Sequence, residues 1–277
     1  MNGSSDKYTA SALSERLLVA GGLVAVSALA WVYTIRMARS MGVSVHPAAA
    51  KVGHAAHQMS GHDTMHSAFT PHLANWGAAE LWMTFVMWSV MMAAMMLPTA
   101  IPMVLAFASV NRQSGKKGVL MPVGVFSAGY LGVWAVFCTG ATALQWGLLR
   151  AALLSPLTLA SGPLLGGVLL ILAGIFQWTP WKEACMQKCR NPLGYLLTHW
   201  QPGRLGAFRL GSRFGIYCVG CCWLLMLICF SLGVMNLVWM AVLTIFMLVE
   251  KISAAGRTIS RAAGIVLAIW GGWMIIC

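Results

Sequence analysis

Residues 80–102 read ELWMTFVMWSVMMAAMMLPTAIP, an apolar run that ends in a Pro-Thr-Ala-Ile-Pro break. An α-helix needs about 20 mostly apolar residues to cross a bilayer, and this run is long enough. Proline bends or ends a helix because it lacks a backbone N–H and clashes with the preceding turn. The stretch therefore predicts a transmembrane helix over residues 79–97, with a kinked continuation past Pro98 and Pro102 toward Val110.

The composition of the whole chain indicates the same kind of protein. Of its 277 residues, 59% are hydrophobic and 9% are charged, and the mean hydropathy is +0.77. A soluble domain has about 25% charged residues, so this composition excludes an ordinary soluble protein. We expect an all-α fold, a polytopic transmembrane helical bundle with about seven spans. The predicted spans lie near residues 17–35, 79–97, 120–141, 163–178, 213–231, 234–250 and 262–276.

The chain divides into three parts on this interpretation. Residues 1–35 form an N-terminal tail and the first transmembrane helix, residues 36–78 an external His/Met-rich loop, and residues 79–277 the transmembrane helical domain. Residues 142–162 have enough apolar character for a re-entrant or interfacial segment, which leaves a count of six to eight spans open.

The basic residues test this topology, because loops on the cytoplasmic side of a membrane are enriched in Lys and Arg. With seven spans, the N-terminal tail and every second loop hold all but four of the 18 basic residues. The four on the other side are Arg36, Arg39, Lys51 and Arg150. We therefore attribute the net charge of +12 to membrane topology rather than to nucleic-acid binding. The expected location is the bacterial inner membrane, with the N-terminus in the cytoplasm.

The external loop contains side chains that bind metals. Imidazole binds copper, zinc, nickel and iron, and thioethers among the imidazoles shift the preference toward copper, above all Cu(I). The spacing does not match a structural zinc finger, so we expect a copper-binding loop, with zinc or another transition metal as alternatives. Incidental affinity of a low-complexity tract, or a pH-sensitive linker, is the competing interpretation. The predicted loop ligands are His54, His57, Met59, His62, Met65 and His66.

Methionines recur along the helix predicted over residues 79–97. Thioether sulfur is a soft ligand that suits Cu(I), but methionine also fills irregular gaps in a core. At about 100° per residue, Met92 and Met96 lie further round the helix than the others, so we assign these two to packing. The residues that share one face, and that we predict to be ligands, are Glu80, Met83, Met87 and Met91.

Two sets of cysteines are predicted to lie near the cytoplasmic side. Thr179 and Pro180 have the residue types of a helix N-cap and first helical position, and the short helix that they begin places Cys185 and Cys189 one turn apart. Thiols stay reduced on that side of the membrane, so the two sets could form a soft thiolate site. Ordinary packing is the alternative, because cysteine is also a small hydrophobic residue. The second set, on the span over residues 213–231, consists of Cys218, Cys221 and Cys222.

Charged residues near spans and the lack of catalytic motifs limit the function further. Glu250 is followed by Lys251, so a local ion pair or a place at the membrane interface would explain this buried acid without a function.

The chain has no G-x-S-x-G, Walker A or H-E-x-x-H motif. The sequence leaves enzymatic activity open and favours a protein that is not an enzyme.

Three composite motifs occur in a recognisable order: WMTFVMWSVMMAAMMLP at residues 82–98, QWTPWKxxCxxxCRxP at 177–192, and GxxCxGCCW at 215–223. With these motifs the chain resembles the DUF2182 family, described as predicted metal-binding integral membrane proteins of bacteria. The likeness runs from about residue 79 to 275. It implies a membrane location and metal binding, and it implies no particular reaction. The histidine loop lies outside the shared motifs.

Together these patterns predict a membrane protein that acquires, transfers or delivers copper through a series of His, Met and Cys ligands. The ion would enter at the external loop, pass the methionine face and reach the cysteines. Expected partners are the lipid bilayer and a cuproenzyme or a subunit of a membrane complex, with no nucleic acid. Two alternatives stay open: a structural or assembly subunit of a membrane enzyme complex, and a membrane oxidoreductase.

Overall fold

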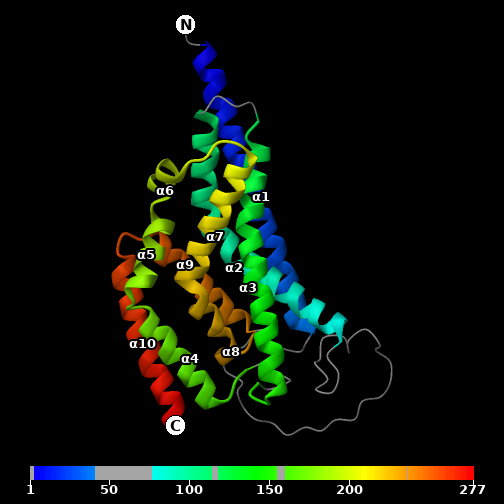
Figure 1. The fold of residues 1–277 in the computed structure, drawn as a ribbon, viewed down its shortest axis with the longest axis vertical. Helices are drawn as coiled ribbons and strands as arrows, with labels where there is room; N and C mark the ends of the chain where they lie inside the picture. The colour runs from blue at the N-terminus through cyan, green and yellow to red at the C-terminus, as the bar shows by residue number, and fades with distance from the viewer. Residues whose placement is uncertain (1–2, 41–76, 114–117, 155–159, 235) are drawn as a thin grey trace.

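The computed structural model describes residues 3–40, 77–113, 118–154, 160–234 and 236–277 (Figure 1). Within these ranges the chain forms ten α-helices and no strand, and each predicted span overlaps at least one helix. The all-α helical bundle is thereby confirmed. The helices are α1 (Gly3–Ser40), α2 (Ala78–Gln113), α3 (Leu120–Arg150), α4 (Pro163–Phe176), α5 (Pro180–Arg190), α6 (Pro192–His199), α7 (Arg204–Leu227), α8 (Cys229–Leu232), α9 (Leu237–Ile252) and α10 (Gly256–Ile276).

Some of the helices are long and apolar enough to cross a bilayer without help from a neighbour. In the described residues these are the five helices α1, α2, α3, α7 and α10. A sixth span arises if α4 and α5, which are bent by 66° relative to each other, count as one. The helix α9 matches a predicted span but has 16 residues, fewer than a span needs. The helix lengths thus support five or six spans, fewer than the seven expected, and only the count of six lies within the predicted range of six to eight.

Several helices extend further than their predicted spans, and two of them change the predicted boundaries most clearly. The helix α1 continues to Ser40, past the predicted boundary at residue 35, and α3 continues to Arg150. Buried Trp88 donates a hydrogen bond of 2.8 Å from its Nε1 to Oε1 of Gln145, which ties this last part of α3 to α2. Residues 142–150 are therefore part of the third span and not a separate re-entrant segment, because α3 is one continuous helix from Leu120 to Arg150.

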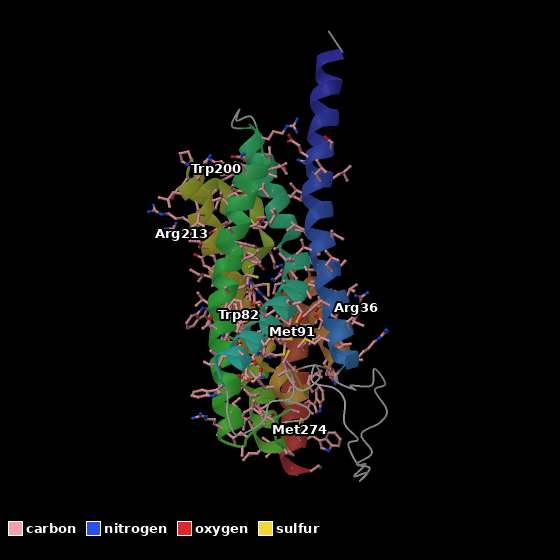
Figure 2. The ribbon with its side chains drawn as sticks, turned by 90° about the vertical axis from the view of Figure 1, so that its right-hand side faces the viewer. Arg36, Trp82, Met91, Trp200, Arg213 and Met274 are labelled. Atoms are coloured by element: carbon pink, nitrogen blue, oxygen red, sulfur yellow. The ribbon has the colours of Figure 1, made fainter. Side chains whose placement is uncertain are left out.

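The long helices run roughly parallel to the long axis of the molecule (Figure 1). The start of α1 and the end of α10 lie at opposite ends, and large apolar side chains such as Leu29, Ile269 and Val136 are exposed on the outside. Trp200 and Met274 lie toward opposite ends of the bundle (Figure 2). An exposed apolar surface of this kind suits contact with lipid tails.

Glycines bring two pairs of helices into close contact. A Cβ on Gly211 of α7 would lie 2.0 Å from the backbone oxygen of Phe126 in α3, so no larger residue fits there. The same kind of contact joins α4 to α10, where small residues let two backbones approach. The glycines that face each other there are Gly167 with Gly271 and Gly174 with Gly264.

Pro98 determines how α1 attaches to α2. Proline has no N–H, so it cannot satisfy the carbonyl oxygen of Ala94 four residues earlier. Two side chains of α1 donate to that oxygen instead: Oγ of Ser27 and Nε1 of Trp31, each at 3.1 Å. A backbone group freed by proline is thus satisfied by a neighbouring helix, as is usual in membrane helices.

This arrangement predicts that Ser27→Ala combined with Trp31→Phe will destabilise the protein more than the sum of the single changes. The double change leaves the Ala94 carbonyl buried without a donor, at a cost of about 1–3 kcal/mol. The measurement is the Tm of the detergent-solubilised protein. Pro98→Ala restores the missing N–H, so in its background the double change should cost much less. An equal cost in both backgrounds would contradict the role given to Pro98.

Candidate metal centre

The helix α5 begins and ends where its sequence requires. The Thr179 side chain accepts a hydrogen bond of 3.3 Å from the backbone N–H of Lys182, and Pro180 occupies the first helical position, as predicted. The helix places Cys185 and Cys189 one turn apart on the side that packs against α7. On α7, Gly220 makes room for this contact, since a Cβ there would lie 3.0 Å from Cys185 Sγ.

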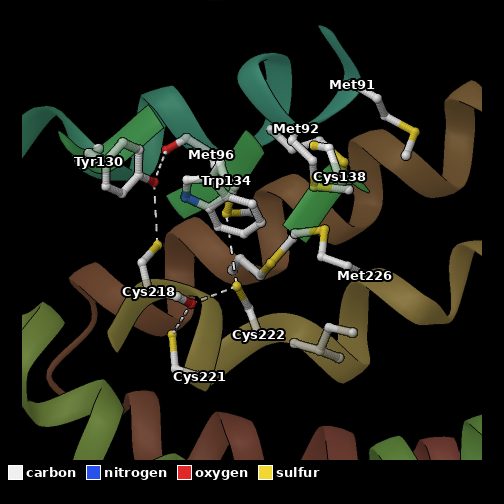
Figure 3. Packing of buried hydrophobic residues seen from close by; sticks show 14 of the residues in the cluster. Met91, Met92, Met96, Tyr130, Trp134, Cys138, Cys218, Cys221, Cys222 and Met226 are labelled. Carbon is white, nitrogen blue, oxygen red and sulfur yellow. Dashed lines mark hydrogen bonds between the residues drawn. The ribbon is translucent and has the colours of Figure 1, made fainter. Parts of the chain in front are cut away.

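Sulfur atoms from three helices meet beside α7, and we call this set the sulfur cluster. The thiol of Cys189 in α5 lies close to Cys218 and Cys221 and interacts with both, and Cys218 also interacts with Cys222. From α2, the sulfur of Met96 lies 4.0 Å from Cys222 Sγ (Figure 3). The cluster therefore consists of Cys189, Cys218, Cys221, Cys222 and Met96. The structure thus brings Cys189 of the first predicted set to Cys218 and Cys221 of the second, while a metal at this place stays a prediction.

The structure brings Met96, which the helical arc assigns to packing, to the cysteines, and it places the predicted methionine face differently. Met83 is 42% exposed near the start of α2, where the Glu80 carboxylate accepts a hydrogen bond of 2.9 Å from the backbone N–H of Gly77. Met87 and Met91 are buried in the core. Figure 3 shows Met91 away from Cys218, Cys221 and Cys222. Ligation by Glu80, Met83, Met87 and Met91 stays a prediction.

A buried lysine contacts the sulfur cluster. Nζ of Lys251 donates to Cys218 Sγ at 3.1 Å and to Thr99 Oγ1 at 3.0 Å, and Tyr130 Oη lies 3.4 Å from the same Sγ. A local ion pair between Glu250 and Lys251 is wrong, because neighbouring residues on a helix point about 100° apart and these two face different helices. Lys251, like Met96, is a residue of this site that the sequence does not reveal.

Glu250 belongs to a second buried network beside the cluster. Its Oε1 accepts a hydrogen bond of 2.5 Å from Nζ of Lys182. The same Nζ also donates a hydrogen bond to Gln177 Oε1. Ser260 of α10 donates to the same Gln177 oxygen at 2.9 Å. The pair joins α5 to α9, and a buried ion pair with these hydrogen bonds has one preferred geometry. The network therefore fixes α5 against α9, the helix that also carries Lys251.

The six predicted ligands of the external loop lie outside the described residues: His54, His57, Met59, His62, Met65 and His66.

The donor set of the sulfur cluster fits a soft monovalent metal. All eight cysteines are free thiols. In the described residues, no three His, Cys, Asp or Glu side chains stand ready to hold a metal ion. Instead, the thiols of Cys221 and Cys222 donate to the carbonyl oxygen of Cys218, at 3.1 and 2.9 Å. A metal would bind only after these thiols lose their protons and turn toward it. Thiolate and thioether sulfur then select Cu(I) over hard cations.

Comparison with known proteins adds one finding. A family model named PpoB2 and described as a copper chaperone matches residues 85–274, which include α5, α7, α9 and the sulfur cluster. The match supports a copper-related family for the motifs quoted above, and it does not name the DUF2182 family. No curated protein and no solved structure matches the chain.

The buried ion pair predicts an asymmetric result from substitution. Glu250→Gln leaves the Lys182 ammonium buried without an anion, which costs about 3–5 kcal/mol, whereas Lys182→Met with Glu250→Leu removes both charges and costs much less. Thermal unfolding in detergent, followed by intrinsic tryptophan fluorescence, measures the difference. Arg257→Gln, which breaks the exposed ion pair of 2.6 Å with Glu183, is the control and should change the Tm little. A double variant as unstable as Glu250→Gln would contradict this prediction.

Proposed function

Because the chain belongs to the PpoB2 copper chaperone family, we propose that it binds Cu(I) at the sulfur cluster within a membrane and passes the ion to another copper protein. The observation that supports this proposal best is the meeting of four cysteines and Met96 next to the Lys251 ammonium. These residues come from four helices and lie far apart in the sequence, so accidental packing of neighbours along one helix does not explain their meeting.

Lys251 gives the site a favourable charge balance. Two thiolates around one Cu(I) ion have a net charge of one negative unit, and the ammonium of Lys251 cancels it. A neutral assembly is far less costly to bury than an isolated charge. Lys182 serves the same purpose for Glu250, so the carboxylate does not compete for Lys251. The charges on α9 thus leave one ammonium available to the sulfur cluster.

The number of sulfur donors suits transfer of the ion. The cluster has more donors than a Cu(I) ion with two or three ligands uses at one time. An incoming thiol or thioether can therefore replace one ligand while the others hold the ion. Met96 is a neutral donor at the edge of the set, and its long side chain can turn with little change in packing. Exchange of this kind needs no large movement of the helices.

We further propose in which membrane the chain lies and in which direction copper moves through it. The chain would lie in the bacterial inner membrane with its N-terminus in the cytoplasm and the histidine loop outside. The loop would capture copper, Glu80 with Met83, Met87 and Met91 would form the path inward, and a cuproenzyme or a subunit of a membrane complex would receive the ion. The apolar helices support a membrane location, and the soft donors support copper as the cargo.

Substitution of the central cysteines tests the proposal. Cys218→Ser with Cys221→Ser should abolish the tightest Cu(I) binding of the full-length protein in detergent, because a hydroxyl is a hard and protonated donor. Binding is measured by competition with a chromogenic Cu(I) chelator. Cys277→Ser, at the exposed end of α10, is the matched control and should bind as the wild type does. Unchanged affinity in the double variant would overturn the proposal.

Lys251 should act on affinity through charge. Lys251→Met removes the ammonium but keeps a flexible side chain of similar length. The loss of a group that contacts a metal ligand, rather than the metal itself, costs about 10–100-fold in metal affinity. Lys251→Arg keeps the charge and should restore much of the affinity. A charge effect also appears as a steeper loss of affinity toward low pH in Lys251→Met, because protons then compete better for the thiolates. An equal loss in both variants, without a change in pH dependence, would contradict this role.

A further inference from the structure

A cavity of about 220 Å³ lies between α2 and α3, next to the sulfur cluster. Its wall includes three sulfur side chains, from Met92, Met96 and Cys138, together with Trp134 and Tyr130. Neither Met92 nor Cys138 has a place in the proposed site so far, and both are almost fully buried. We call this space the α2–α3 cavity.

The sulfur atoms of the cavity come from facing turns of two helices. Met92 and Met96 are four residues apart on α2, and Trp134 and Cys138 are four residues apart on α3, so each pair shares one helical face. Both pairs line the same space. A cavity that held only a lipid chain would need no sulfur, whereas two thioethers, a thiol and an indole ring are groups that bind a soft cation.

The α2–α3 cavity and the sulfur cluster have two side chains in common. Met96 lines the cavity, and its Sδ lies 4.0 Å from Cys222 Sγ. Tyr130 also lines the cavity, and its Oη lies 3.4 Å from Cys218 Sγ (Figure 3). An ion in the cavity would therefore be one ligand exchange away from the cluster, with Met96 able to reach either position.

We propose that the α2–α3 cavity is a second binding site for a soft monovalent cation, Cu(I) in the cell, with Met92 and Cys138 as its own ligands and Met96 shared with the sulfur cluster. This inference rests on the proposed function, since it concerns the same cargo. Binding involves no change in the oxidation state of the metal, and the Cys138 thiol loses its proton to solvent as the metal–sulfur bond forms. The ion would bind in this cavity with lower affinity than at the adjacent sulfur cluster.

The test uses Ag(I), a redox-stable soft cation, with the full-length protein in detergent. Bound Ag(I) per chain is measured by elemental analysis after gel filtration against a weak thioether competitor. Met92→Leu with Cys138→Ser should lose one bound ion and keep the ion of the cluster, while Cys218→Ser with Cys221→Ser should lose the other. Met121→Leu with Cys277→Ser removes the same kinds of atom outside the cavity and should lose none.

The two proposals fail in different ways in this experiment. If Met92→Leu with Cys138→Ser binds as many ions as the wild type, the cavity is not a site, and the cluster is unaffected. If Cys218→Ser with Cys221→Ser loses no ion, the proposed function itself is wrong. Cys138→Met retains a soft donor and should restore the ion that Cys138→Ser loses. If the double variant does not fold, the single change Cys138→Ser decides, because it removes the only thiol among the named cavity ligands.

Discussion

A lysine ammonium buried against a cysteine is the interaction on which the rest of this site depends. Lys251 is 8% exposed, and a charge in such a place must have a compensating partner. Its neighbours are the sulfur of Cys218 and the hydroxyl of Thr99, so the charge faces the sulfur cluster and not solvent. Because Glu250 is paired with Lys182, the positive charge beside the cluster is not cancelled by the adjacent carboxylate.

The helix α2 links the site to the rest of the bundle through its proline break. Pro98 leaves the carbonyl oxygen of Ala94 without a partner in its own helix, and this oxygen accepts hydrogen bonds from Ser27 and Trp31 of α1. Met96 and Thr99, within two residues of the same proline, contact the cluster and its lysine. The hydroxyl of Thr99 also donates to the carbonyl oxygen of Met96 at 2.9 Å. One proline therefore coincides with the attachment of α1 and with the residues that α2 contributes to the metal centre.

The sequence predicts which segments are helical and which residues share a helical face, because hydrophobic length and capping residues are local properties. The membrane helices, the cap at Thr179 and the pairing of Cys185 with Cys189 on one face follow from such properties. The rotation of one helix against another is not local. For that reason the helical arc alone assigns Met96 to packing, and the sequence does not identify the partners of Lys251 and Glu250, which lie 33 and 68 residues away along the chain.

X-ray absorption spectroscopy of the protein loaded with a single equivalent of Cu(I) tests the central claim most directly. At that loading the tightest site fills first, so the account predicts that the nearest neighbours of copper are all sulfur atoms. In Cys218→Ser with Cys221→Ser, the copper should move to nitrogen or oxygen donors of weaker sites. Nitrogen or oxygen neighbours in the wild type, or a spectrum that these substitutions leave unchanged, would contradict the assignment of copper to the sulfur cluster.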